Sequence, residues 1–177
     1  YNTRTTISPL HAALIASLPV NDGKIMQPFV IERIVSENGQ EVYSKKIKTV
    51  SQPLSSKSVD NLRELMQGTV QNGTARNSFA NLRRLQDVHN WIMGGKTGSI
   101  DLPLHRGRCD WFAGFGQDGE TRLAVSFILI HGANRTVRSS YVAAETLKGA
   151  FLKETTASRS QSQPVQYVGK KSIKKSV

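Results

Sequence analysis

Cysteine and long apolar segments are scarce in this sequence. Its 177 residues include one cysteine, Cys109, which excludes an intrachain disulfide. No stretch approaches the roughly 20 apolar residues that a transmembrane helix needs, and the longest apolar run, Leu123 to Ile130, has the length of a strand. The four histidines are dispersed, and no Cys/His cluster has the spacing of a zinc site. We therefore expect neither a metal nor a cofactor.

Acidic residues are also few, at 13 against 24 lysines and arginines, which gives a formal net charge of +11. Basic chains often bind nucleic acids or acidic polymers. Here, however, the basic clusters lack interleaved aromatic residues and any recognised nucleic-acid motif. A solvated surface with no nucleic-acid partner is therefore favoured, and salt-dependent binding to DNA is the observation that would revive the alternative.

The ends of the chain differ from its middle. The first residues are polar and include no Met, which is typical of the interior of a longer protein. From about Thr155 the chain is rich in Ser, Gln and Lys, a composition that predicts disorder. We therefore expect one structural unit over residues 1–154 and a basic, polar tail over 155–177.

Helical and hairpin patterns occupy the first half. Ser8-Pro9 is a typical helix start, and the helix that follows is apolar nearly all round, so it should be buried. Asn38-Gly39 lies between two strand-like runs and predicts a hairpin turn. The elements expected here are a helix from Ser8 to Leu18, a hairpin from Pro28 to Tyr43, a helix from Ser58 to Asn72, and a mixed segment from Thr74 to Asn90.

Three strands and a final helix are predicted in the second half. The strands are expected at Trp91–Ser99, Asp110–Gly116 and Leu123–Ile130, and the last is apolar enough to be central. Short connections favour antiparallel pairing. Ser139 or Ser140 should cap the closing helix. The predicted fold class is α+β, with an antiparallel sheet flanked by helices.

The segment Lys96-Thr97-Gly98-Ser99 is the strongest functional signal. Lys-Thr-Gly by itself is a weak motif, but here it ends a strand after Gly94-Gly95 and precedes a Trp-Phe-Ala-Gly-Phe strand. Together with a Ser-x-x-Lys and a Ser-Asp-Asn type element, it forms the set shared by penicillin-binding proteins and serine β-lactamases. The chain resembles the C-terminal part of a penicillin-binding protein transpeptidase domain, a β-lactamase-like fold that would be incomplete in this chain.

Other segments carry the same resemblance, in order, over roughly residues 5 to 154. Ile7–Ala13 is similar to the buried helix of that family, and Pro28–Val30 is similar to the entry to its hairpin. Val70–Ala75 is similar to the end of the helix before its Lys-Thr-Gly strand. The resemblance implies an extracytoplasmic protein, anchored in the inner membrane, that acts on peptidoglycan stem peptides and binds β-lactams.

The resemblance also implies roles for the motif in acyl transfer from a D-Ala-D-Ala peptide to a serine. Lys96 would supply positive potential at the substrate carboxylate and the serine network. Thr97 and Ser99 would offer hydroxyl groups, with Ser99 the closer carboxylate contact and its backbone N–H one of two oxyanion-hole donors. Gly98 would allow close approach of the substrate. In this family the fourth residue is usually Thr, and Ser99 keeps the hydroxyl.

The nucleophile element is missing from the expected place. The only Ser-x-x-Lys match, Ser172 to Lys175, follows the Lys-Thr-Gly strand instead of preceding it. Ser36-Glu37-Asn38 imitates the Ser-Asp-Asn type element, but it lies in the hairpin turn. We therefore expect both true elements, and the first strands of the sheet, upstream of Tyr1. The chain alone should be inactive, the edge of the Leu123–Ile130 strand should be unpaired, and the upstream half of the same domain should be its partner.

Several alternatives stay open. A β-lactam sensor or a catalytically degenerate relative would keep the fold and act as a binding module. A serine β-lactamase would need a deacylating base upstream. Gly94 and Gly95 either form a bulge or belong to the site, and Arg108 with Asp110 is expected to form a surface ion pair. Three aromatic residues are expected to pack in the core: Trp111, Phe112 and Phe115.

Overall fold

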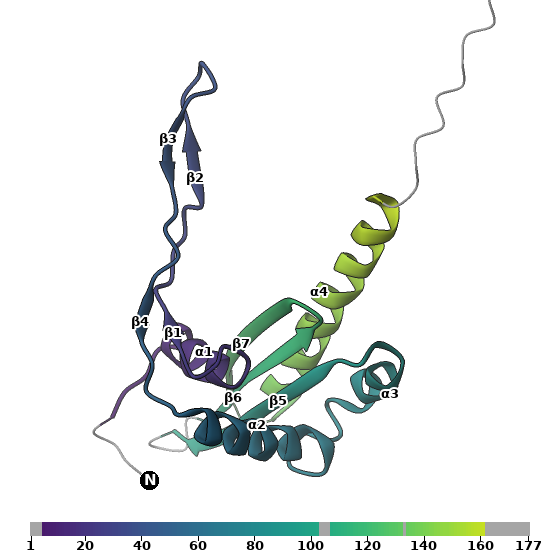
Figure 1. Ribbon diagram of the computed structural model, residues 1–177. Coiled ribbons are helices and arrows are strands. Elements are labelled where there is room, and N and C mark those ends of the chain that lie inside the picture. The colour runs from purple at the N-terminus through teal and green to yellow at the C-terminus, as the bar shows by residue number, and fades with distance from the viewer. Residues whose placement is uncertain (1–4, 103–106, 133, 162–177) are drawn as a thin grey trace, which may run out of the picture.

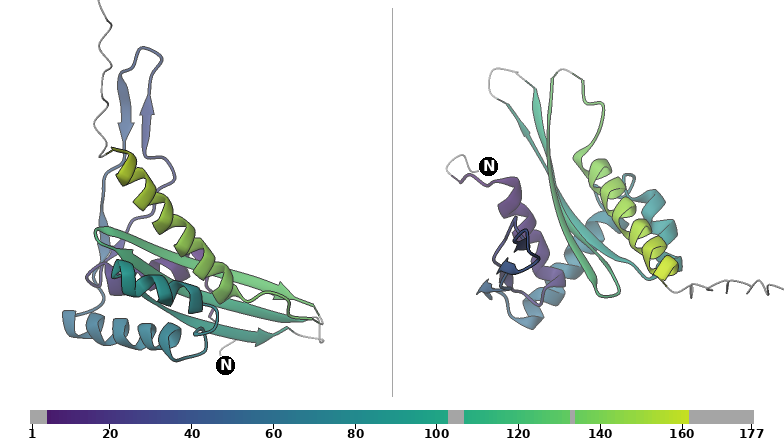
Figure 2. Two further views of the ribbon diagram at one scale, coloured as in Figure 1. Left: turned by 90° about the vertical axis from the view of Figure 1, so that its right-hand side faces the viewer. Right: turned by 90° about the horizontal axis from the view of Figure 1, so that it is seen from above.

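A three-stranded antiparallel sheet lies at the centre of the molecule. The computed structural model describes residues 5–102, 107–132 and 134–161. The sheet has the order β5-β6-β7 and is formed by β5 (Ile92–Asp101), β6 (Arg108–Asp118) and β7 (Thr121–His131). The helices are α1 (Pro9–Ser17), α2 (Ser56–Gln71), α3 (Ala80–His89) and α4 (Ser139–Gln161), with a short 3-10 turn at Leu18–Val20. Helices cover both faces of the sheet, with α1 and α4 on opposite sides (Figures 1 and 2).

The pairing within the sheet confirms the predicted meander. β5 and β6 pair in unbroken register from Ile92 opposite Gln117 to Asp101 opposite Arg108. β7 lies on the other side of β6, and its outer edge is unpaired among the described strands, as expected for a chain without the first strands of the sheet. That Leu123–Ile130 is central in the complete sheet stays a prediction. That strand is apolar because α1 packs on one of its faces and α4 on the other. Its apolar composition is therefore explained by the helices that cover its two faces.

Two groups of buried side chains hold the layers together. Phe112 is fully buried among residues of α4, together with Phe79 and Leu82. On the other face Phe115 packs against Met66 of α2. Phe112 and Phe115 are thus core residues, as predicted, whereas Trp111 is only partly buried.

The first helix begins where the sequence predicts but is less buried than expected. Ser8 caps it, since the Ser8 Oγ accepts a hydrogen bond of 3.1 Å from the His11 backbone N–H. Ala12 and Ala16 are buried, yet Leu10 is 58% exposed and Ile15 is 42% exposed. Only one side of this helix meets the rest of the described residues, which is why the prediction of full burial is wrong.

The predicted hairpin forms an arm that projects from the body (Figure 1). Its first strand, β2 (Arg33–Val35), is shorter than the predicted Phe29–Val35 strand, and its second, β3 (Glu41–Ser44), is displaced by one residue from the predicted Gln40–Tyr43 strand. The turn closes with a 2.9 Å hydrogen bond from the Ser36 N–H to the Gln40 carbonyl, and Gly39 takes a positive φ of 81°. A second small ladder joins β1 (Ile25–Met26) to β4 (Thr49–Ser51) at the base of the arm. These strands are too short for sequence patterning to reveal.

The remaining helix boundaries differ modestly from expectation. α2 begins two residues before Ser58, because Ser55 is its cap and accepts from the Ser58 N–H at 3.3 Å. The mixed segment contains α3. The last helix continues to Gln161 and so passes the tail boundary predicted at residue 154. The rest of the predicted tail, with Ser172 and Lys175, lies outside the described residues.

Candidate active site

The Lys96–Ser99 segment lies in the exposed half of β5. Met93, Gly94 and Gly95 are buried, whereas Lys96, Gly98 and Ser99 are exposed and Thr97 is partly buried. β6 pairs with one edge of β5, and no described strand pairs with the other edge. The motif therefore lies on an open strand edge, where an extended peptide can add as a further strand.

The glycines of β5 serve different purposes. A Cβ at Gly95 would lie 2.2 Å from the Phe112 ring, and one at Gly94 would lie 2.6 Å from the Phe115 ring. Since the register has no irregularity here, these two glycines do not form a bulge and instead make room for core aromatic rings. At Gly98 the nearest atom to an added Cβ is the Trp111 Cβ at 3.5 Å, an ordinary contact. Packing among the described residues does not require Gly98.

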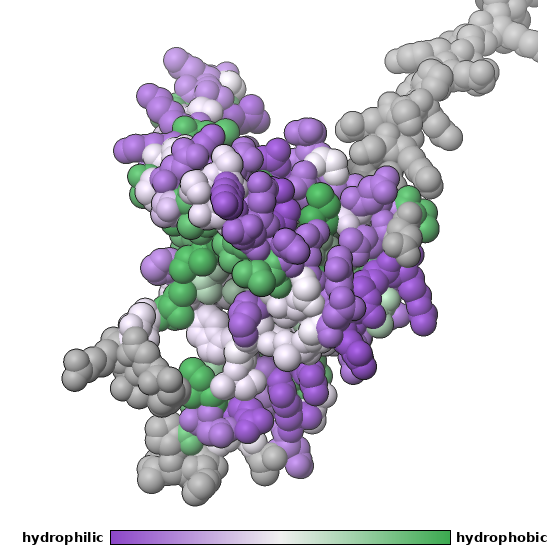
Figure 3. Space-filling view, turned by 60° about the horizontal axis from the view of Figure 1, so that its bottom comes forward, coloured by the Kyte–Doolittle hydropathy of each residue, from purple (hydrophilic) through white to green (hydrophobic). Residues whose placement is uncertain are grey.

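Lys96 lies beside an apolar cavity. Its Nζ donates a 2.6 Å hydrogen bond to the Thr97 carbonyl. The cavity, of about 490 Å³, lies between α1, α2 and the sheet and is lined by Ala12, Ile15, Ala16, Leu62, Leu65, Met66, Thr69, Gly95, Lys96 and Ala113. Two apolar side chains of its lining are exposed, Ile15 at 42% and Leu65 at 73%. Figure 3 shows hydrophobic residues gathered in patches among hydrophilic ones on one face of the molecule.

Thr97 is held by a residue that sequence reasoning did not select. Its hydroxyl lies 2.6 Å from that of Thr74, and either can be the donor. Thr74 follows the end of α2, within the Val70–Ala75 segment that carries part of the family resemblance. The two threonines are 23 residues apart, and no local sequence pattern indicates their contact.

Ser99 adjoins a buried carboxylate, which is a second residue whose place was not predicted. The Ser99 hydroxyl donates to Asp110 Oδ1 at 3.2 Å. Asp110 is only 2% exposed and pairs with Arg135, while its Oδ2 accepts from the Ser139 N–H at 2.8 Å and the Ser139 hydroxyl at 3.0 Å. Asp110 thereby caps the start of α4.

Electrostatics keep that carboxylate ionised. Burial acts to raise the pKa of Asp110, but hydrogen bonds from Arg135 and Ser139 outweigh it and lower the pKa to about 2. The predicted surface ion pair between Arg108 and Asp110 is wrong, because Arg108 Nε pairs with Asp101 at 2.7 Å. Asp110 faces inward to α4 and cannot form a surface pair.

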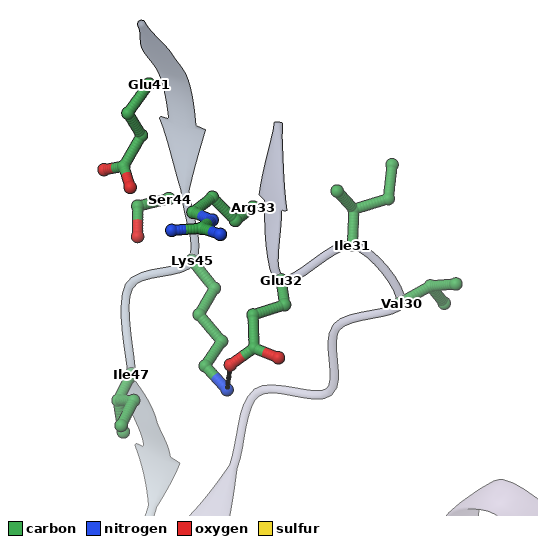
Figure 4. A pocket seen from close by; sticks show the side chains of 8 residues that line it. All are labelled: Val30, Ile31, Glu32, Arg33, Glu41, Ser44, Lys45 and Ile47. Carbon is green, nitrogen blue, oxygen red and sulfur yellow. Dashed lines mark ion pairs between the residues drawn. The ribbon is translucent and has the colours of Figure 1, made fainter. Parts of the chain in front are cut away.

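A second cavity, of about 850 Å³, lies on the arm. The residues that line it are distant from Lys96 in the sequence. Figure 4 shows it, with Lys45 pairing to Glu32 and Val30 pointing away from that ion pair.

Within residues 5–102, 107–132 and 134–161, no group of three or more His, Cys, Asp or Glu side chains is placed to hold a metal. None of the helices in that part of the chain is long and apolar enough to cross a membrane.

The chain is similar to several solved structures. It matches the D,D-transpeptidase domain of a peptidoglycan glycosyltransferase from Eggerthella lenta at 24% identity and a TM-score of 0.69, over 88% of this chain and 36% of that one. It matches penicillin-binding protein A from M. tuberculosis, in an imipenem acyl-enzyme complex, at 17% identity and a TM-score of 0.69, over 85% and 32%. Penicillin-binding protein 3 from the same organism matches at 16% identity and a TM-score of 0.70, over 86% and 36%.

These structures share the α+β fold predicted from the sequence, and this chain spans about a third of their length. None of the curated proteins matches this chain at a significant level. The model of the penicillin-binding protein transpeptidase domain matches residues 1–151. With that match, the unbroken Lys-Thr-Gly strand and the helices on both of its faces, the chain belongs to the penicillin-binding protein transpeptidase domain family.

Proposed function

We propose that this chain is the part of a peptidoglycan DD-transpeptidase domain that binds the terminal carboxylate of D-Ala-D-Ala stem peptides and of β-lactams. The observation that carries the proposal is the open edge of β5, where Lys96 and Thr97 stand beside a glycine that packing does not require. The parent protein would act outside the cytoplasm, anchored in the inner membrane.

The chemistry of the edge suits this substrate. A carboxylate is best received by an ammonium group and hydroxyl donors, which Lys96 and Thr97 supply. Gly98 is exposed, and its missing side chain lets the substrate backbone approach closely. The family resemblance assigns the Ser99 N–H to the oxyanion hole, where it would stabilise the tetrahedral intermediate of acyl transfer.

The nucleophilic serine would come from a segment upstream of Tyr1. Two observations support this proposal. The Lys96 side chain adjoins an apolar cavity, and Ile15 and Leu65 in its lining expose apolar surface of the kind that marks an interface. The open edge of β7 offers the upstream strands a place to pair. The upstream half of the domain would thus cover the α1–α2 face and bring its serine to Lys96.

Labelled penicillin tests the proposal. Penicillin-binding protein A of M. tuberculosis forms acyl-enzyme complexes with imipenem and penicillin G. We expect a protein that joins this chain to the upstream segment to form a covalent adduct too. Lys96→Ala should slow its formation on the order of 100-fold, the scale for loss of one donor to the transition state. Lys57→Ala, an exposed lysine of α2, is the matched control.

Each other outcome has a clear meaning. Equal labelling of the Lys96→Ala and Lys57→Ala proteins would show that Lys96 takes no part in acylation. A stable adduct without any transfer to a peptide amine would favour the β-lactam sensor or degenerate relative over the transpeptidase. Absence of any adduct in the joined protein would contradict both.

A further inference from the structure

The α2–α3 connector, residues 72–79, turns between the two helices in Figure 1. Arg83 of α3 clamps its first part, because the Arg83 Nη1 donates to the Val70 carbonyl at 2.8 Å and to the Arg76 carbonyl at 2.6 Å. One guanidinium nitrogen carries two hydrogens and can serve both carbonyls. Val70 lies in the last turn of α2, where carbonyls lack partners within the helix. Arg83 thus joins the end of α2 to the connector.

The second part of the connector is joined to α4. The Ser78 hydroxyl lies 2.7 Å from the Ser140 hydroxyl, and either can be the donor. Ser140 is 2% exposed and lies in the first turn of α4. Ala75 and Phe79 are fully buried and pack in the core. The connector is therefore fixed to two helices and to the core, although most of its residues are exposed.

Thr74 lies between these two anchors and reaches the Lys96–Ser99 segment. Its hydroxyl is 2.6 Å from the Thr97 hydroxyl. The oxygen of a threonine side chain takes one of three staggered positions, and this hydrogen bond selects the position that faces Thr74. A displacement of the connector by about 1 Å would take the two oxygens beyond hydrogen-bond distance. The place of the connector therefore decides how the Thr97 hydroxyl is oriented.

We propose that Arg83 and Ser140 are positioning residues of the active site, which hold the α2–α3 connector so that Thr74 fixes the orientation of the Thr97 hydroxyl. The proposal rests on the proposed function, which places Thr97 at the ligand carboxylate. Neither anchor needs to touch the ligand, since Arg83 bonds backbone carbonyls and Ser140 is buried. Their effect passes through Thr74.

Acylation by a penicillin and by its carboxylate methyl ester measures this effect. The protein is this chain joined to the nucleophile-bearing segment, and the quantity measured is the ratio of acylation rates, acid over ester. Thr97→Val sets the scale and should lower the ratio about 10-fold, as for a hydrogen bond to a charged group.

Loss of either anchor should have a smaller effect of the same kind. Arg83→Ala and Ser140→Ala should each lower the acid-over-ester ratio about 3-fold, the low end for one hydrogen bond, because Thr97 keeps its hydroxyl and loses only its fixed orientation. Arg84→Ala is the matched control, since Arg84 is the exposed neighbour of Arg83 on α3, and it should leave the ratio unchanged. Thermal melting of each variant reports folding separately.

A double substitution distinguishes positioning from a general loosening of the fold. In the Thr97→Val protein no hydroxyl is left to orient, so Arg83→Ala should lower the ratio no further, and the two effects should be far from additive. If Arg83→Ala fails to fold, Ser140→Ala takes its place in both measurements, because it removes a single oxygen atom.

The inference is overturned if folded Arg83→Ala and Ser140→Ala proteins keep the ratio of the unsubstituted protein, if Arg84→Ala lowers the ratio equally, or if the double variant shows a further fall. In each of these cases the proposed function still stands, provided that the unsubstituted protein is acylated. If neither penicillin nor its ester reacts with the unsubstituted protein, the proposed function fails, and the inference fails with it.

Discussion

The two halves of strand β5 follow different rules although they are continuous in sequence. From Ile92 to Gly95 the strand is largely buried, and its glycines make room for the rings of Phe112 and Phe115. From Lys96 onward it is mostly exposed, and Gly98 meets no side chain that would require a glycine. The first half is explained by packing and the second is not. The residues that packing leaves unexplained are those that the proposed function assigns to a ligand.

Truncation of the core ring should have the largest effect, and only on the buried half. Phe112→Ala should lower the free energy of unfolding by about 3–5 kcal/mol, the usual cost of removing a fully buried phenylalanine. Ile100→Ala, in the exposed half and 40% exposed, should cost well under half as much. Urea denaturation followed by circular dichroism measures both. Similar losses for the two variants would show that the halves do not differ in packing.

A methyl group added to each half gives a closer comparison. Gly95→Ala should destabilise the chain by about 3 kcal/mol, the upper end for overpacking, because its Cβ would lie 2.2 Å from a ring carbon of Phe112. Gly98→Ala should change stability by less than about 0.5 kcal/mol and yet slow acylation of the joined protein by penicillin. The comparison breaks down if the methyl at residue 98 destabilises as much as the one at residue 95.

Acid should weaken the hydrogen bonds of Asp110, which link Ser99 in the exposed half of β5 to the start of α4. The pKa of Asp110 falls from 3.8 to about 2 on folding. A lowered pKa stabilises the folded state above the unfolded pKa, and this contribution is lost as the pH falls through the folded value. About 2 kcal/mol of stability should therefore disappear between about pH 4 and pH 2. Asp110→Asn should lack this component, and a denaturation series at several pH values compares the two proteins.

Loss of the threonine pair should have the smallest effect on stability. Thr74→Val removes one hydroxyl from an exposed pair and should cost about 0.5 kcal/mol, the low end for a hydrogen bond. Acylation should fall more clearly than stability does, because Thr97 loses the partner that orients it. A change in stability that exceeds the change in acylation would make Thr74 a structural residue only.

Much of the fold was predictable because its signals are local. Ser8-Pro9 marks the first helix, Asn38-Gly39 marks the hairpin turn, and short connections imply an antiparallel meander. The small ladder between β1 and β4 was harder to predict, since strands of two and three residues carry no alternating pattern.

The site was predictable only as far as contiguous residues define it. Lys96 to Ser99 lie together on the exposed half of β5, as the motif implied, and their roles stay predictions. Thr74 and Asp110 reach this segment through tertiary contacts that span 23 and 11 residues of sequence, and Arg135 reaches Asp110 across 25 residues. Short patterns do not encode such contacts, which is why Asp110 was expected on the surface and lies buried instead.

The central claim is that the exposed half of β5 binds the carboxylate and that another segment supplies the serine. Labelled penicillin tests both parts in one measurement, applied to the isolated 177-residue chain and to the same chain joined to the upstream segment. We predict no covalent adduct on the isolated chain, and on the joined protein an adduct that Lys96→Ala slows on the order of 100-fold. Clear labelling of the isolated chain, or labelling that is indifferent to Lys96, would contradict the claim.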